Sequence, residues 1–194
     1  MEKQEKALLT IIVPAYNVEA YIEECLNSLV NQTVRNHKII IVNDGSTDKT
    51  EEKCLKYKEE YEELITYVYQ DNKGLGGARN TGMQYVDTPY LTFLDSDDWL
   101  SIKFVEKFSK LMEWTDEKPE MVFTLPWVFD SVTNRILSWK DKEIYDSIFE
   151  VKENKSYVKT NVRKNPELSW KLVRVEKFIK QSFLKIINFS SQKN

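Results

Sequence analysis

The 194-residue sequence contains only two cysteines, Cys25 and Cys54, and a single histidine, His37. Disulfide-stabilised scaffolds are shorter and richer in cysteine, so we expect two buried, reduced thiols rather than a disulfide. The histidine precedes an apolar segment, where we expect a surface or edge position. The sequence therefore offers no cysteine–histidine pair for catalysis.

The sequence also lacks a long apolar run and a marked excess of one charge. The apolar run near the N-terminus, residues 8–13, is too short to span a bilayer. Residues 1–6 are charged and do not lead into a signal peptide, so we expect a cytoplasmic protein. With 28 basic and 31 acidic residues the net charge is -3, which gives no general attraction to nucleic acid or to anionic membranes.

Apolar residues make up 41% of the chain, enough for one sizeable α/β domain with a short extension. Strand-like and helix-like patterns alternate over the first hundred residues. β-Branched apolar runs indicate buried parallel strands, the first of which we expect to stop at Pro14. The spacing predicts βαβ units with right-handed crossovers. We expect strands at 8–13, 38–42, 64–70 and 90–94, and helices at 18–30, 48–63 and 78–86.

Beyond residue 100 the pattern is less regular. We expect a helix at 102–114, then strands at 121–129 and 135–139 joined by a hairpin loop at 130–134. Residues 141–165 are charged and weakly patterned. Apolar residues return with helical spacing at 168–187, which predicts a final helix.

Polar residues follow each of the four predicted parallel strands. Tyr16 and Asn17 follow the first strand, Asp44 the second, residues 71–73 the third and residues 95–98 the fourth. Open α/β sheets bind ligands at the carboxyl ends of their strands. We therefore expect these groups to meet in one crevice.

The segment Asp95-Ser96-Asp97-Asp98 places three carboxylates on one turn. Charges this close repel each other unless a cation lies among them. Mg²⁺ takes one or two carboxylates together with substrate phosphates, and Mn²⁺ accepts the same ligands. A structural alternative is that Asp97 or Asp98 caps a helix beginning near Ser101. The preceding buried strand and the other polar clusters favour the metal site.

Two further segments have a functional and a structural interpretation. The carboxylate of Asp44 can accept a hydrogen bond from the N–H of a pyrimidine base, whereas the following Gly45 indicates a turn. Residues 71–80 form a glycine-rich segment whose backbone N–H groups can meet a phosphate. This segment matches neither a Walker loop nor the dinucleotide fingerprint. Arg79 can bind a base or a diphosphate, or remain solvated, and Tyr16 can stack on a base or simply pack.

Together these segments resemble family 2 of the inverting glycosyltransferases, which have the GT-A fold. The resemblance covers about residues 8–112 and lies in four ordered segments, 11–17, 41–48, 77–82 and 93–98. It implies an α/β, Rossmann-like fold with a mixed, mostly parallel sheet flanked by helices and a short C-terminal extension. Residues 1–115 would form the nucleotide-sugar-binding half, and residues 116–194 the acceptor-side strands and C-terminal helix.

The resemblance also implies a role for individual residues. Asp44 would recognise the base, usually uracil, and Arg79 would contact the nucleotide. Asp97 would coordinate Mn²⁺ or Mg²⁺ at the diphosphate, supported by Asp95 and Asp98, with Asp95 also near the ribose. The full set expected at the nucleotide sugar is Pro14, Tyr16, Asn17, Asp44, Asn72, Gly74, Arg79, Asp95 and Ser96.

The general base is where the sequence departs from the family pattern. Residues 168–174 resemble the segment that shortly precedes the family's acidic motif, yet no Glu-Asp pair follows them. Either the chain is truncated, or the base comes from elsewhere, or acceptor chemistry is impaired. Asp146 and Glu150 are candidates by elimination only, and solvated charges are the alternative for both.

Three functions remain to be compared. The first is a transferase acting on a saccharide, lipid-linked or protein acceptor, and the second is a nucleotide-sugar-binding module without a complete acceptor site. The third, a nucleotidyltransferase, would need a glycine-rich basic loop after the first strand, which residues 14–17 do not provide. The predicted final helix either packs on the sheet or makes peripheral contact with the inner face of a membrane. Its basic residues are Lys171, Arg174, Lys177, Lys180 and Lys185.

Overall fold

The computed structural model describes residues 7–114, 121–123, 128–130, 135–137 and 185–188. The chain divides into two compact units. The first comprises Met1–Thr124 with Ser182–Asn194, and the second comprises Leu125–Gln181. Within the described residues no helix is long and apolar enough to cross a membrane.

The first unit is built on a six-stranded sheet with the order β3-β2-β1-β4-β8-β5. Strands β1 to β4 are parallel, and β8 runs antiparallel to both β4 and β5. The predicted mixed, mostly parallel sheet is therefore confirmed. The strands are β1 (Leu9–Ala15), β2 (His37–Asp44), β3 (Ile65–Gln70), β4 (Tyr90–Phe93), β5 (Met121–Phe123) and β8 (Lys185–Asn188).

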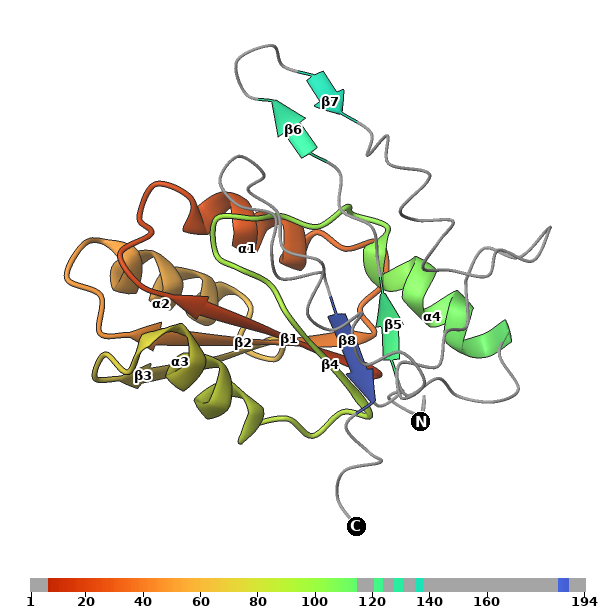
Figure 1. The fold of residues 1–194 in the computed structure, drawn as a ribbon, viewed down its shortest axis with the longest axis horizontal. Coiled ribbons are helices and arrows are strands. Elements are labelled where there is room, and N and C mark those ends of the chain that lie inside the picture. Colours follow the sequence, from red (N-terminus) through yellow and green to blue (C-terminus); the bar gives the residue numbers. More distant parts are fainter. Residues whose placement is uncertain (1–6, 115–120, 124–127, 131–134, 138–184, 189–194) are drawn as a thin grey trace, which may run out of the picture. The chain divides into compact units, whose positions relative to one another are not determined.

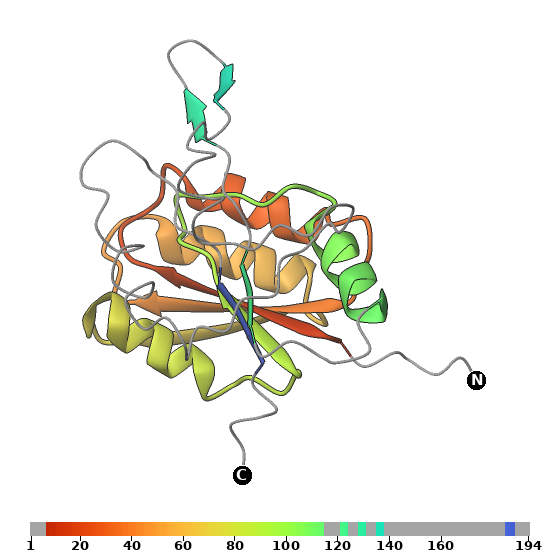
Figure 2. The ribbon, with the colours of Figure 1, turned by 45° about the vertical axis from the view of Figure 1, so that its right-hand side comes forward.

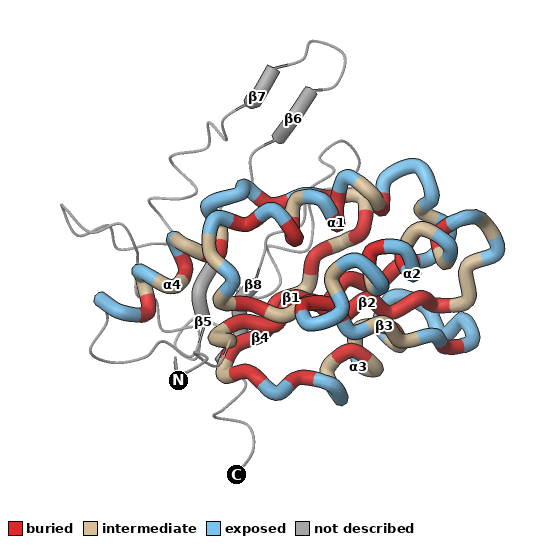
Figure 3. Tube along the Cα trace, turned by 180° about the vertical axis from the view of Figure 1, so that it is seen from behind, coloured by how far each residue is buried: buried red, intermediate tan, exposed pale blue. Residues whose placement is uncertain are grey.

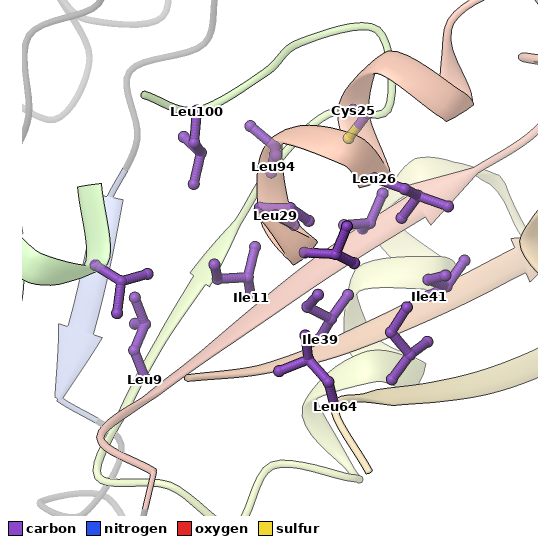
Figure 4. Close-up of a cluster of buried hydrophobic side chains, with 14 of the residues drawn as sticks. Leu9, Ile11, Cys25, Leu26, Leu29, Ile39, Ile41, Leu64, Leu94 and Leu100 are labelled. Atoms are coloured by element: carbon purple, nitrogen blue, oxygen red, sulfur yellow. The ribbon is translucent and has the colours of Figure 1, made fainter. Parts of the chain in front are cut away.

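Helices cover both faces of this sheet (Figures 1 and 2). The helices are α1 (Ile22–Val30), α2 (Thr50–Glu60), α3 (Gly74–Met83) and α4 (Phe104–Trp114). Side chains alternate along β1, so Ile11 belongs to the core that includes side chains of α1, α2 and α4, whereas Ile12 belongs to the smaller core that includes Ala78 of α3. Figure 4 shows part of the larger core, with Leu26 and Leu29 of α1 above Ile39 of β2. The parallel strands are largely buried and the loops exposed (Figure 3).

Helix α3 lies very close to the sheet at Gly82. A Cβ atom at this position would lie 2.4 Å from Cγ2 of Ile12 and 3.3 Å from Cγ2 of Val42. A glycine is therefore required for this approach, although it weakens the helix intrinsically. The contact fixes the height of α3 above β1 and β2.

Several predicted boundaries differ from the structure. Strand β1 does not stop at Pro14 but continues to Ala15, because Pro14 lies beyond Ile12, the last β1 residue paired with β4, and needs no ladder donor there. Helices α1 and α2 begin later than expected, at Ile22 and Thr50. Helix α3 begins earlier, at Gly74, so the glycine-rich segment forms its first turns.

The largest differences lie after residue 120. The predicted strand at 121–129 is two strands in different units, β5 and β6 (Val128–Asp130). In the second unit β6 pairs antiparallel with β7 (Arg135–Leu137), which confirms the hairpin. The predicted helix at 168–187 is wrong at its end, since Lys185–Asn188 is strand β8. Residues 168–184 lie outside the described part.

Both cysteines are buried, free thiols, as predicted, with Cys25 on α1 and Cys54 on α2. Burial raises the pKa of Cys54 to about 12 and also raises the pKa of Cys25. Both thiols are therefore neutral at physiological pH, which makes them poor nucleophiles.

The expected surface position of His37 is wrong. His37 is the first residue of β2 and is only 3% exposed, because its ring lies beneath the end of α1. Its Nε2 donates a hydrogen bond to the carbonyl oxygen of Leu29 at 3.0 Å. Burial lowers the pKa of His37, and the hydrogen bond to Leu29 only partly opposes this.

We predict that His37 makes the stability of the protein depend on pH near neutrality. In the unfolded chain a histidine titrates at about pH 6.5. As the pH falls through this value the unfolded state takes up a proton that the folded state resists, so the free energy of unfolding should decrease. Urea denaturation between about pH 7.5 and pH 5 should show that the free energy of unfolding changes less with pH in His37→Gln than in the unmodified protein. Parallel curves for the two proteins would contradict this role.

Candidate functional site

The sheet reverses its strand order between β1 and β4. From β1 the chain proceeds to β2 and β3 on one side, and then crosses back to place β4 on the other side of β1. Ligands bind to open α/β sheets at such a reversal of strand order, outside the carboxyl ends of the strands. The loop after β1 and the acidic turn after β4 flank this point.

The loop after β1 is joined to the loop after β2 by hydrogen bonds from the side chain and backbone of Asn17. The Asn17 carboxamide oxygen accepts from the backbone N–H of Thr47 at 2.8 Å, and the Asn17 N–H donates to Oγ of Ser46 at 3.1 Å. Asn17 has a φ of 50°, in the left-handed region. Next to it, Val18 N–H donates to Oγ1 of Thr50 at 2.8 Å.

Two acidic side chains, one from each loop, also join these two loops by accepting hydrogen bonds from the backbone of the other loop. Asp48 accepts from the backbone N–H of Glu19 at 3.1 Å, and Glu19 accepts from the backbone N–H of Lys49 at 2.8 Å. Asp48 also accepts from Thr50 N–H at 2.9 Å, at the start of α2. The two loops therefore form one connected rim, beside which Tyr16 is 49% exposed.

Asp44, the last residue of β2, is buried and holds two other segments. Its Oδ1 accepts from Nε2 of Gln70 at 2.5 Å and from the backbone N–H of Lys73 at 2.9 Å. Gln70 ends β3, and its Oε1 accepts from the hydroxyl of Thr81 on α3 at 2.5 Å. A single carboxylate thus links the end of β2, the end of β3 and the start of α3.

Gly45 allows the segment after β3 to approach this carboxylate. Its φ is 75°, and a Cβ atom here would lie 3.0 Å from the backbone nitrogen of Asn72. The Asn72 carboxamide accepts from Gly74 N–H at 3.2 Å, where α3 begins. The exposed residues Asn72 and Gly74 therefore flank Lys73, whose backbone N–H binds Asp44, at the start of a helix where a phosphate could bind.

Arg79 connects α3 to the end of β4. Its Nη2 donates to Oδ1 of Asp95 at 2.7 Å, and its guanidinium carbon lies 5.5 Å from the ring centroid of Phe93. The Nε of Arg79 is buried and has no hydrogen-bond partner. The side chains of Arg79 and Asp95 remain 33% and 28% exposed, so this ion pair is accessible to a ligand.

The acidic turn follows directly. Asp98 N–H donates to the carbonyl oxygen of Asp95 at 3.0 Å; Ser96 and Asp98 are buried, whereas Asp97 is partly exposed. The Cys25 thiol lies 3.9 Å from the carbonyl oxygen of Asp95. After burial itself, the carboxylate of Asp98 is the largest contribution to the raised pKa of Cys25. Helix α4 begins only at Phe104, so neither Asp97 nor Asp98 occupies its N-cap position.

The carboxylates of this turn suit a hard divalent cation. The described residues contain no preformed group of three or more His, Cys, Asp or Glu side chains that could hold a metal ion. Mg²⁺ bound with a nucleotide needs only one or two carboxylates, since phosphates and water complete its coordination. The oxygen donors of Asp95 and Asp97 therefore fit a cation that arrives with a phosphorylated ligand.

The predicted site residues come together at one edge of the sheet, except for the base candidates. Asp146 and Glu150 lie outside the described residues. Pro14 is buried in β1, one residue before the end of the strand. Sequence reasoning did not predict Gln70 or Thr81 as part of the site. The one sequence feature that could have indicated Gln70 is its position as a polar residue at the end of an apolar strand.

Known proteins match this chain in sequence and in structure. The sequence model of glycosyl transferase family 2 matches residues 10–165. Glycosyltransferase GlyA of Streptococcus pneumoniae serotype 4 is 36% identical over 160 residues, covering 77% of this chain and 23% of the relative. Minor teichoic acid biosynthesis protein GgaB of Bacillus subtilis is 41% identical over 102 residues, covering 52% of this chain and 11% of the relative.

Among solved structures, S. aureus TarS 1–349 in complex with UDP-GlcNAc matches with a TM-score of 0.51 and 29% sequence identity. The match covers 55% of this chain and 31% of that structure. The chain thus spans less than a third of the length of each of these relatives.

We predict that Asn17 stabilises the rim in two separable ways. Asn17→Gly removes the hydrogen bonds to Thr47 but retains the left-handed backbone, whereas Asn17→Ala removes the bonds and also strains the backbone. The alanine variant should lose about 1 kcal/mol more of the free energy of unfolding than the glycine variant. Urea denaturation measures this difference, and equal stability of the two variants would contradict it.

Proposed function

The chain belongs to glycosyl transferase family 2, and on that premise we propose that it transfers a sugar from a UDP-sugar by metal-assisted inverting displacement. The observation that carries the proposal is the placement of Asp44 and the acidic turn at the carboxyl ends of β2 and β4, on the two sides of β1. Residues 1–115 would then form the donor-binding half of the enzyme.

In this proposal the base and the sugar nucleotide are held by groups from four segments. Asp44 accepts a hydrogen bond from the N–H of uracil, and the exposed ring of Tyr16 stacks on the base. Arg79, already oriented by Asp95 and Phe93, donates its remaining N–H groups to the nucleotide. The TarS structure contains UDP-GlcNAc, which supports a uridine nucleotide for this chain.

Asp97 and Asp95 would hold Mn²⁺ or Mg²⁺ at the diphosphate, with Asp98 supporting the turn. When bound, the cation neutralises the charge that develops on the departing nucleoside diphosphate. The chain's own contribution is to keep Asp97 partly exposed beside the ion pair of Arg79 and Asp95. Arg79 adds a positive charge on the same side.

The acceptor belongs to the half of the chain after residue 115. We propose a saccharide or lipid-linked acceptor in cell-surface polymer synthesis, because one relative carries the name of a teichoic acid biosynthesis protein. A protein acceptor, contact with the inner face of a membrane and a cytoplasmic location stay predictions. The general base also remains unassigned, since Asp146 and Glu150 lie outside the described residues.

We predict that UDP binding depends on the metal and on Asp97. Calorimetric titration of UDP should show tighter binding with Mn²⁺ than without it for the unmodified protein. Asp97→Ala should abolish this gain, a loss of about tenfold or more in affinity, because the bridge between carboxylate and diphosphate is removed.

Asp87→Ala is the matched control, since Asp87 forms an exposed ion pair with Lys38 at the opposite end of the strands. This variant should keep the response to Mn²⁺. A folded, unmodified protein that binds neither UDP nor a UDP-sugar with Mn²⁺ would contradict the proposed function.

A further inference from the structure

The two carboxylate oxygens of Asp44 have different surroundings. Oδ1 accepts hydrogen bonds from Gln70 Nε2 and from Lys73 N–H. Oδ2 receives no hydrogen bond from any part of the chain that the structure describes. Among those residues only His37 Nδ1 and Arg79 Nε are buried polar atoms without a partner, so Oδ2 keeps contact with solvent. Only one oxygen of Asp44 is therefore available to a ligand.

The orientation of the Gln70 amide is set by its two neighbours. An ionised carboxylate can only accept, so Gln70 must present its NH₂ group to Asp44. The amide oxygen then faces Thr81, whose hydroxyl must donate to it. Gln70 is 8% exposed and Asp44 is 3% exposed, so water does not readily replace these bonds. Thr81 therefore donates to Gln70, and Gln70 in turn donates to Asp44.

Resting on the proposed function, we propose that Gln70 is a specificity-determining residue for the nucleobase. By occupying Oδ1 together with the backbone N–H of Lys73, it leaves Asp44 a single acceptor, Oδ2, for the pairing edge of the base. Uracil presents one N–H there, between two carbonyl oxygens, and one acceptor satisfies it. Guanine presents two adjacent N–H groups, which would require both oxygens of a freely turning carboxylate. Cytosine presents an unprotonated nitrogen, which an acceptor repels.

This arrangement determines what an isosteric change at Asp44 does. In Asp44→Asn the amide oxygen must keep facing the donors of Gln70 and Lys73, since an NH₂ group there would oppose both of them. The amide nitrogen therefore takes the place of Oδ2. The atom that meets the base changes from an acceptor to a donor, which matches cytosine and opposes uracil.

The experiment is calorimetric titration of UDP, CDP and GDP, each with Mn²⁺, into the full chain. The variants are Asp44→Asn, Gln70→Met, the double variant and Gln84→Met, which changes an exposed glutamine at the end of α3. Circular dichroism melting checks that each variant is folded. The ratio of affinities between nucleotides is the decisive quantity, because a general loss of structure weakens all three nucleotides together.

We expect the unmodified protein and Gln84→Met to prefer UDP. Asp44→Asn should lose about 100-fold in UDP affinity, because the amide and the base then oppose each other as two donors, and should bind CDP more tightly than UDP. Gln70→Met should lose about tenfold for UDP and reduce the preference for UDP over GDP. In the double variant only the backbone N–H of Lys73 still holds the amide oxygen, so the amide turns over more easily and the CDP preference should weaken.

Two outcomes would overturn the inference while leaving the proposed function intact. One is an Asp44→Asn variant whose CDP binding does not improve relative to UDP. The other is a Gln70→Met variant with the unmodified ratio of UDP to GDP affinity. An unmodified protein that binds no nucleotide would instead contradict the proposed function, and the inference with it.

Discussion

The buried carboxylate of Asp44 is the group on which the arrangement of the site depends. It ends β2, accepts from Gln70 at the end of β3, and accepts from the backbone of Lys73 where α3 begins. An unpaired charge buried at this point would be costly, so the three segments must meet there for the fold to be stable. The start of α3 in turn sets the position of Arg79, one turn further on, and Arg79 contacts Asp95 beyond β4. Through α3, one carboxylate thus connects the end of β2 to the acidic turn after β4.

Much of the fold follows from local sequence. The β-branched runs at 8–13 and 38–42 have no other common interpretation than buried strands, and the polar residues after them mark the strand ends. The predictions that are wrong concern residues whose structure depends on partners distant in the sequence. Residues 185–188 continue an apolar spacing that suits a helix, but pairing with β4 and β5 makes them a strand. The burial of His37 likewise depends on α1, whose position above the sheet no local pattern shows.

The candidate site likewise contains residues that the local sequence indicates and partners that only the fold brings to them. Asp44, Asp95 and Asp97 could be predicted as candidates because acidic residues that follow buried parallel strands are easily recognised, and Arg79 because it follows a glycine-rich segment that opens a helix. Their hydrogen-bond partners were not identified, since Gln70 and Thr81 are ordinary polar residues until the fold joins them. Asn17 was expected to border the nucleotide, and the structure shows that its carboxamide oxygen holds the neighbouring loop at Thr47. The structure therefore shows a structural role for Asn17 in the rim, whereas its contact with a nucleotide stays a prediction.

In the proposed function, one metal–nucleotide ligand contacts the ends of β2, β3 and β4 together. Amide NMR spectra of the ¹⁵N-labelled chain, titrated with UDP and Mg²⁺ and then with a small fraction of Mn²⁺, test this directly. We expect shifts for the amides of residues 44–45, 72–74 and 95–98, with the strongest Mn²⁺ broadening at 95–98. Amides at the opposite end of the strands, such as those of Leu8 and Tyr90, should change little. Changes confined to one of these segments, or centred at the opposite end of the sheet, would contradict binding of one ligand by all three strand ends.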